Sequence, residues 1–200
     1  MSSERIRMLQ GEPYNSRDPE LLALAHRARA LLRRYNASES TDGDGRRALL
    51  GELLGSVGED VWIEPPFFCE YGAHIHMGSR SFIHVNAVLL DSAEIRIGDD
   101  TLIGPGAQII TATHPLDPSE RLLANWTRDS GRAPYWTSAL PITIGSRVWI
   151  GAGTILTPGV TIGDNSVIGA GSVVTRDIPA DCVAYGQPCR VRDQGSGARG

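Results

Sequence analysis

The stretch ITIGSRVWIGAGTILTPGVTIGDNSVIGAGSVVTRDIP, residues 142–179, decides the fold of this chain. From Ile144 onward an aliphatic residue opens each six-residue phrase, and glycine follows it in four of the six phrases. The aliphatic positions are Ile144, Ile150, Leu156, Ile162, Ile168 and Val174. A period of six fits no α-helix and is typical of a parallel β-helix, in which each phrase is one short strand plus one corner. The coils stack because none of them can bury its aliphatic row alone.

The same phrase recurs upstream of this stretch. It runs from Met77 to Glu94 and again from Ile97 to His114, and the frame slips by two residues at Ile95. The slip predicts a small bulge or a longer corner. Because the frame breaks completely after His114, residues 115–141 are expected to leave the β-helix as an external loop. Periodicity leaves the handedness open, although crossovers between parallel strands are nearly always right-handed.

The two ends of the chain lack the hexapeptide pattern. Residues 1–56 predict a small helical cap, in which Asp18 as N-cap and Pro19 at the first helical position open a helix that Asn36 ends. A second short helix is expected over residues 46–54. The β-helix then occupies residues 57–193, and residues 194–200, which hold nothing to bury, predict a disordered tail.

Composition is typical of one domain with an appendage. The chain has 200 residues, a net charge of −4 and 41% hydrophobic residues. No stretch is long enough to span a membrane, and the first residues lack the apolar core of a signal peptide. The net charge argues against nucleic acid as the main partner. The cysteines, Cys69, Cys182 and Cys189, are odd in number and lack CxxC spacing, which predicts reduced thiols and a cytoplasmic protein.

Six further motifs carry a family resemblance. They are GEPY (11–14), IEPPFFCEYG (63–72), TATHPLD (111–117), ITIGSRVWIGAG (142–153), PGVTIGDNSVIGAGSVVTRDIP (158–179) and GQPCRV (186–191). In this order they resemble the maltose and galactoside O-acetyltransferases and the nodulation acetyltransferases. The resemblance implies a left-handed β-helix and a homotrimer with active sites between subunits. It also implies that acetyl-CoA donates its acetyl group directly to a sugar hydroxyl, with no covalent enzyme intermediate and no metal.

His114 is the predicted catalytic residue. It matches the histidine of the family's THP motif, and it stands where the hexapeptide frame breaks. A hydroxyl is a poor nucleophile, and an imidazole can accept its proton as the attack on the thioester begins. The alternative is a loop histidine that only caps a corner.

The resemblance also assigns the binding of CoA. The residues are Trp149, Gly151, Ala152, Ala170, Thr175, Arg176 and Arg190. The backbone N–H of Ala152 would stabilise the oxyanion, and the arginines would bind phosphates. The alternatives are an ordinary corner at Ala152, a surface aromatic at Trp149 and a solvated basic rim.

The acceptor side departs from the family pattern. The resemblance implies acceptor contacts by Glu70, His84, Asn86 and Asp91, but His84 stands where relatives carry Asn, and Glu70 where they carry Asp or Ser. The identity of the acceptor therefore stays open.

The external loop departs from the pattern as well, because Trp136 falls where relatives carry a Glu that supports the catalytic histidine. Three aromatic residues, Trp126, Tyr135 and Trp136, are expected to pack either on their own β-helix or on a neighbouring subunit over its acceptor pocket.

Two other functions remain open at this stage. His74 and His76, two residues apart, would share one strand face and suit a zinc-dependent lyase of the carbonic anhydrase type. The repeats would also serve a non-catalytic scaffold.

Overall fold

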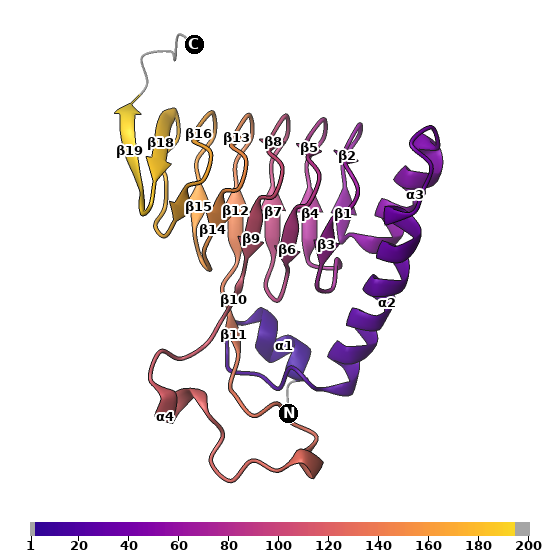
Figure 1. Cartoon of the computed structure of the whole chain (residues 1–200), viewed down its shortest axis with the longest axis vertical. Helices are drawn as coiled ribbons and strands as arrows, with labels where there is room; N and C mark the ends of the chain where they lie inside the picture. The colour runs from indigo at the N-terminus through magenta and orange to yellow at the C-terminus, as the bar shows by residue number, and fades with distance from the viewer. Residues whose placement is uncertain (1–2, 195–200) are drawn as a thin grey trace.

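Parallel strands build three flat sides of a β-helix in the computed structural model, which describes residues 3–194 (Figure 1). The first side consists of β1 (Ser56–Val57), β4 (Ile75–Met77), β7 (Ile95–Ile97), β12 (Ile142–Ile144) and β15 (Thr161–Ile162). The second consists of β2 (Trp62–Ile63), β5 (Phe82–Ile83), β8 (Leu102–Ile103), β13 (Trp149–Ile150), β16 (Val167–Ile168), β18 (Cys182–Gly186) and, antiparallel to β18, β19 (Cys189–Gln194). The third consists of β3 (Phe68–Cys69), β6 (Val88–Leu90), β9 (Gln108–Ile110), β14 (Ile155–Leu156) and β17 (Val173–Val174).

Strand register explains the slip in the repeat. His76 lies one coil above Ser56, 20 residues later, whereas Asn165 lies one coil above Arg147, only 18 residues later. The additional residues of the early coils lie between the end of the third side and the next first-side strand. We call this turn the long corner. The sequence analysis predicted a longer corner as one reading of the slip at Ile95, and the register confirms it.

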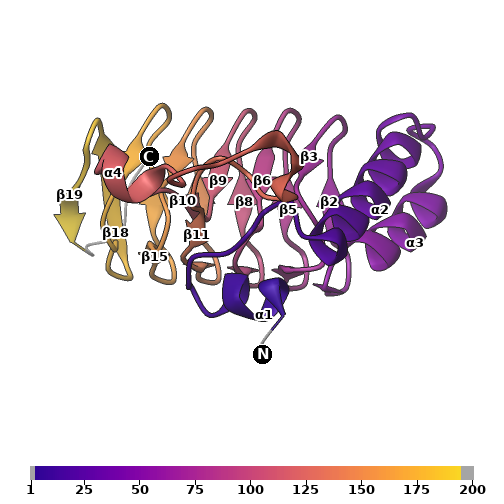
Figure 2. The same ribbon diagram turned by 90° about the horizontal axis from the view of Figure 1, so that it is seen from below.

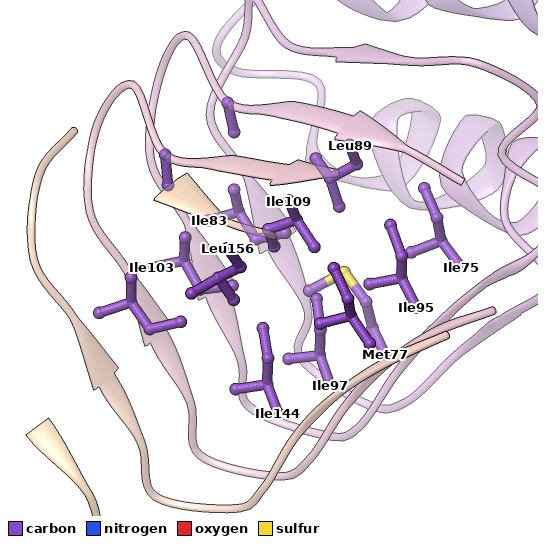
Figure 3. Packing of buried hydrophobic residues seen from close by; sticks show 14 of the residues in the cluster. Ile75, Met77, Ile83, Leu89, Ile95, Ile97, Ile103, Ile109, Ile144 and Leu156 are labelled. Carbon is purple, nitrogen blue, oxygen red and sulfur yellow. The ribbon is translucent and has the colours of Figure 1, made fainter. Parts of the chain in front are cut away.

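Aliphatic side chains from all three sides fill the inside of the β-helix (Figure 3). Met77, Ile97 and Ile144 stack from coil to coil on the first side and are buried. Burial of one such side chain stabilises the fold by about 1.5–3 kcal/mol. The aliphatic residue that opens each hexapeptide is therefore the one that points inward.

The corner between the second and third sides holds a column of left-handed residues. Asn86, Gly106, Gly153 and Gly171 occupy it in successive coils, with φ values of 63°, 68°, 64° and 68°. Glycine adopts this conformation without steric cost, and asparagine is among the few other residues that tolerate it. We call this turn the glycine corner.

Helices cover the N-terminal end of the β-helix, while β18 and β19 close the other end (Figure 2). The helix α2 (Pro19–Asn36) begins at the Asp18 cap, as predicted. The helix α3 (Gly43–Leu53) begins three residues before the predicted start because the Asp42 side chain caps it through Gly45 N–H. The helix α1 (Glu4–Leu9) has no counterpart in the sequence prediction. The Tyr35 hydroxyl donates to the Ile63 carbonyl over 2.6 Å and joins the cap to the first coil.

The predicted external loop leaves the long corner and projects from the β-helix (Figure 1). Its two ends pair as the antiparallel strands β10 (Ala112–Thr113) and β11 (Ser138–Ala139). Between them lie the short helix α4 (Pro118–Arg121) and a 3-10 turn, η1 (Arg128–Ser130).

No helix within residues 3–194 is long and apolar enough to cross a membrane. The three cysteines are buried and form no disulfide with one another. The strand β19 includes Gln194, and the rest of the predicted disordered tail, residues 195–200, lies outside the described residues.

Candidate active site

His114 lies exposed at the start of the external loop, directly after β10. Its ring nitrogen Nδ1 is 2.8 Å from the carbonyl oxygen of Trp136. A carbonyl can only accept a hydrogen bond, so Nδ1 carries the proton and donates. In the neutral ring Nε2 is then the free acceptor, which is the protonation state that a general base needs.

Aromatic and cationic groups of the loop surround this histidine. The Tyr135 ring meets the His114 ring edge to face, with centroids 5.3 Å apart, and keeps 43% of its surface exposed. The Arg132 guanidinium lies over the Trp136 ring at 4.7 Å. The Trp126 indole N–H donates to the Arg132 carbonyl over 2.8 Å. These aromatics thus pack within their own loop, and Tyr135 packs beside the histidine of the same chain. Trp126 and Tyr135 retain exposed surface.

Glu70 lies at the end of the third side, one coil before Asp91 and two before the strand that leads to His114. Arg29 of α2 contacts its carboxylate at 3.1 Å. Burial raises the pKa of Glu70; the Arg29 charge opposes this shift, and the Asp91 charge adds to it. Glu70 is therefore a partly buried carboxylate at the same edge of the β-helix as the catalytic candidate.

Asp91, the third predicted acceptor residue, lies inside the long corner rather than on the open surface. Its side chain is fully buried. Its carboxylate accepts the backbone N–H groups of Glu70 at 3.0 Å, Tyr71 at 2.8 Å and His74 at 3.3 Å. Burial raises the pKa of Asp91, and the hydrogen bond from Tyr71 opposes that shift. Asp91 thus satisfies three backbone donors of the long corner in the preceding coil, which would otherwise need another partner.

The other two acceptor candidates lie at the glycine corner. The Nδ1 atom of the exposed His84 accepts the Val85 N–H over 2.8 Å, so the neutral ring carries its proton on Nε2 and offers a donor to solvent. Asn86 contributes to a hollow of about 320 Å³ with Phe68 and Val88. Its left-handed backbone gives an independent, structural reason for asparagine at this position.

Three CoA candidates come together at the glycine corner, two coils further on. A Cβ atom on Gly151 would lie 2.4 Å from the backbone nitrogen of Ala170, so the two corners stack directly. Ala152, which follows Gly151 in the same corner, is exposed, and its N–H has no acceptor within residues 3–194. Trp149, at the start of the same corner, is 57% exposed on the outside of the second side. The Ala152 N–H is therefore free to bind an oxyanion.

Two predicted phosphate-binding residues meet near the last coil. Arg176 and Arg190 line one hollow of about 330 Å³, together with Asp177, Ile178, Cys189 and Val191. Thr175, next to Arg176, is exposed directly after β17. Two guanidinium groups at one hollow suit the phosphates of CoA.

The catalytic candidate and the oxyanion candidate do not meet within one chain. Strands of the third side begin at the glycine corner, which holds Ala152, and end at the long corner, from which His114 leaves. The two groups therefore lie at opposite edges of this side.

The two neighbouring histidines do not form the face that a zinc site would need. β4 begins only at Ile75, so His74 belongs to the preceding corner. His74 is buried with Nδ1 against the Asp91 carbonyl, whereas Nδ1 of His76 meets the Ser56 hydroxyl. The premise that both share one strand face is wrong. In the part of the chain that the structure describes, no three His, Cys, Asp or Glu side chains are grouped for a metal.

Sequence reasoning missed the group that orients His114. The resemblance pointed to a missing Glu side chain, but the partner is the backbone carbonyl of Trp136. Every residue has such a carbonyl, so no sequence signal identifies it. Arg29, the partner of Glu70, was missed because it lies 41 residues away on α2.

Known proteins resemble this chain in sequence and in structure. A maltose acetyltransferase hexapeptide capping motif matches residues 7–58, and a bacterial transferase hexapeptide model (six repeats) matches residues 141–176. Nodulation protein L of Rhizobium meliloti (strain 1021) is 46% identical over 190 residues, which cover 95% of this chain and 98% of that protein.

Two solved structures share the whole architecture. A maltose O-acetyltransferase from Clostridium difficile 630 is 40% identical with a TM-score of 0.89, over 98% of this chain and 99% of that one. A hexapeptide-repeat acetyltransferase from Vibrio cholerae O1 biovar eltor, complexed with acetyl coenzyme A, is 40% identical with a TM-score of 0.84, over 96% of this chain and 98% of that one. The predicted fold, a left-handed β-helix of hexapeptide repeats with an N-terminal helical region, is confirmed.

Proposed function

This chain belongs to the maltose and galactoside O-acetyltransferase family, and we propose that His114 is its general base in moving an acetyl group from acetyl-CoA to a hydroxyl of a sugar or similar small acceptor. The observation that carries the proposal is the hydrogen bond from Nδ1 of His114 to the Trp136 carbonyl. It leaves Nε2 of an exposed ring free to accept a proton.

The transfer is direct. Nε2 of His114 accepts the proton of the acceptor hydroxyl as its oxygen attacks the thioester carbonyl carbon. The backbone N–H of Ala152 stabilises the oxyanion of the tetrahedral intermediate. The carbon–sulfur bond then breaks, and the CoA thiolate leaves and takes the proton back from the imidazolium. No covalent bond to the enzyme and no metal are needed in this sequence.

Acetyl-CoA extends from the glycine corner to the hollow at the last coil. Trp149, Gly151, Ala152 and Ala170 line its thioester arm, and Thr175, Arg176 and Arg190 hold its phosphate end. The free N–H of Ala152 and the hollow shared by the two arginines support this placement. An arginine fork matches phosphate oxygens better than lysine does.

The enzyme works as a homotrimer with each site between two copies. His114 and Ala152 lie at opposite edges of the third side, so one copy supplies the base and the next copy supplies the oxyanion donor. Exposed apolar side chains on the second side, with Leu102 at 49% and Trp149 at 57%, also favour contact with another molecule.

The acceptor lies between the long corner and the glycine corner of adjacent copies. Glu70, with its raised pKa, and His84, with its free Nε2–H donor, supply polar contacts to sugar hydroxyls. Asn86 borders the apolar hollow beside Phe68. Asp91, which is buried, supports this region through its hydrogen bonds to the backbone of Glu70 and Tyr71.

The test is a thiol-release assay with acetyl-CoA over a panel of sugars and other small hydroxyl compounds. We expect His114→Ala to lower turnover by about two to four decades, the usual effect of removing a general base. The Michaelis constant for acetyl-CoA should hardly change. His26→Ala, which alters an exposed histidine of α2, is the matched control. A His114→Ala variant that keeps more than about a third of wild-type turnover contradicts the assignment.

A further inference from the structure

We infer that Asn15 is a positioning residue for His114, because its side chain holds the external loop so that the Trp136 carbonyl meets the histidine ring. Asn15 belongs to the segment between α1 and α2 and is half-buried. This inference rests on the proposed function, in which His114 is the general base.

The Asn15 amide joins the cap to the loop by two hydrogen bonds. Its Nδ2 donates to the Gly131 carbonyl over 3.2 Å, and its Oδ1 accepts the Ala133 N–H over 3.3 Å. Oδ1 also accepts the Arg17 N–H over 3.2 Å. The orientation of the amide is therefore fixed, because a flipped amide would place a donor against two N–H groups.

The preceding residue anchors the loop at a second point. The Tyr14 N–H donates to the Thr137 carbonyl over 2.9 Å, and both residues are buried. Asn15 in turn donates its own backbone N–H to the Glu4 carboxylate of α1 over 2.5 Å. Two consecutive residues of the cap thus hold the loop on both sides of Trp136.

Trp136 lies between these anchors and carries the acceptor for His114. Its carbonyl lies one peptide plane before the Thr137 carbonyl, so the anchor at Thr137 limits the position of the Trp136 carbonyl but does not by itself fix its direction. On the other strand of this ribbon, Thr113 pairs with Ser138, which places His114 next to the anchored segment. The contacts therefore run from α1 through Asn15 and the loop to the catalytic ring.

Loss of the Asn15 amide would release Gly131 and Ala133 from the cap and leave residues 131–136 held only by contacts within the loop and by the Thr137 anchor. The Trp136 carbonyl would then sample directions in which it no longer accepts the Nδ1 proton, and the ring would populate the tautomer in which Nε2 is protonated. That tautomer cannot accept a proton from the acceptor hydroxyl at Nε2. A misplacement of about 1 Å at a reacting group can cost up to about a hundredfold in rate.

The experiment compares Asn15→Ala and Asn15→Asp with the wild-type enzyme. Asparagine to aspartate keeps the oxygen that accepts the Ala133 and Arg17 N–H groups and replaces the donor to Gly131 with a carboxylate oxygen. We expect Asn15→Ala to lower kcat by about threefold to thirtyfold, with the Michaelis constant for acetyl-CoA within about twofold. Asn15→Asp should fall between wild type and Asn15→Ala. Asp129→Ala, an exposed change in the same loop, is the matched control.

Nitrogen-15 NMR of the His114 ring supplies a readout that does not depend on turnover. His114→Gln identifies its signals among those of the five histidines. The wild-type ring should be protonated at Nδ1 when neutral, and Asn15→Ala should increase the Nε2–H tautomer and the amide hydrogen exchange of residues 131–136.

Each outcome decides the inference. A loss of kcat with an unchanged tautomer would mean that Asn15 acts in another way, and an unchanged kcat would also overturn it. A wild-type protein without acetyl transfer would contradict the proposed function, and the tautomer and exchange data would still decide whether Asn15 positions the ring. If Asn15→Ala does not fold, the same measurements on Asn15→Asp decide.

Discussion

Two residues at the long corner show how position decides the role of a polar side chain. Asp91 and His114 both follow strands of the third side, one coil apart. Asp91 turns inward and satisfies backbone donors, whereas His114 follows the departing loop outward and keeps one ring nitrogen free. The buried carboxylate of Asp91 stabilises the corner, and the exposed imidazole of His114 can perform proton transfer.

Asp91→Asn tests whether the Asp91 carboxylate stabilises the long corner through its hydrogen bonds to backbone N–H groups. The amide keeps one acceptor oxygen but places an NH2 group against a backbone donor, so we expect a loss of about 1–3 kcal/mol in the free energy of unfolding. The Michaelis constant for the acceptor should stay within about twofold, because the side chain is buried. Urea unfolding at one protein concentration and steady-state kinetics measure the two effects, with Asp129→Asn as control. A large rise in the Michaelis constant for the acceptor, with unchanged stability, would show that Asp91 contacts the acceptor.

Glu70→Gln tests the raised pKa of Glu70. A carboxyl group whose pKa is higher in the folded than in the unfolded protein favours folding below its unfolded pKa, near 4.5, and loses that contribution as the pH rises through its folded pKa. Glutamine is neutral throughout and can still accept a hydrogen bond from Arg29. We therefore expect the stability of the variant relative to wild type to be higher at pH 7 than at pH 4.5. Urea midpoints at the two pH values measure this difference, and an equal difference at both would contradict the shift.

The external loop is the element that converts a repeat into a candidate catalytic site. It leaves the β-helix at His114, returns through β11, and brings the Trp136 carbonyl and the Tyr135 ring to the histidine. Its two ends are paired strands, and its far part is held by few contacts to the cap. In such loops the ends are held in place and the exposed residues can vary. These exposed residues commonly decide substrate preference.

Tyr135→Ala tests whether the loop contacts the acceptor. The ring is nearly half exposed beside His114, so it has a face free for a sugar ring. We expect the Michaelis constant for the acceptor to rise about threefold to tenfold, while that for acetyl-CoA stays constant. Steady-state kinetics with each substrate varied in turn separate the two. Trp126→Ala, further along the loop, shows whether a second aromatic contributes. Equal constants for the acceptor in Tyr135→Ala and wild type would place the acceptor elsewhere.

At the scale of the whole molecule, the β-helix separates the two groups that the proposed reaction uses, His114 and the Ala152 N–H. The third side lies between the edge of Ala152 and the edge of His114, and the strands that form it are rigidly stacked. A rigid scaffold cannot fold one edge onto the other. Symmetric association of copies brings unlike edges together without any conformational change.

Mixing two inactive variants tests this arrangement. His114→Ala removes the base, and Ala152→Pro removes the N–H donor. Proline suits this corner because Pro105 precedes the left-handed Gly106 in the coil below, just as Ala152 precedes Gly153. Each variant alone should be inactive. After unfolding and refolding as a one-to-one mixture, about a quarter of the sites should combine one intact group from each copy.

Light scattering of the wild-type protein at micromolar concentration should give the mass of a trimer. No recovery of activity on mixing, with trimers present, would place both groups of a site in the same copy. A monomeric mass would contradict the shared site altogether.

The hexapeptide period by itself determined the coils, the inward aliphatic rows and the point at which the loop leaves, because burial in a stacked coil forces one residue type at one spacing. Likewise, Asp18 and Pro19 determined the start of α2, because capping is a local interaction. The motif around His114 marked the catalytic candidate, and the frame break gave its position independently.

Only the tertiary structure decided what surrounds these residues. Asp91 is buried because the long corner of the neighbouring coil folds over it, and its acidic side chain does not reveal this. The orienting group of His114 is a backbone carbonyl, which every residue has. The contact between Asn15 and the loop spans 116 residues of sequence. Periodicity reports on repeated burial, whereas single contacts between distant segments depend on how the chain returns to itself, and no local pattern records that.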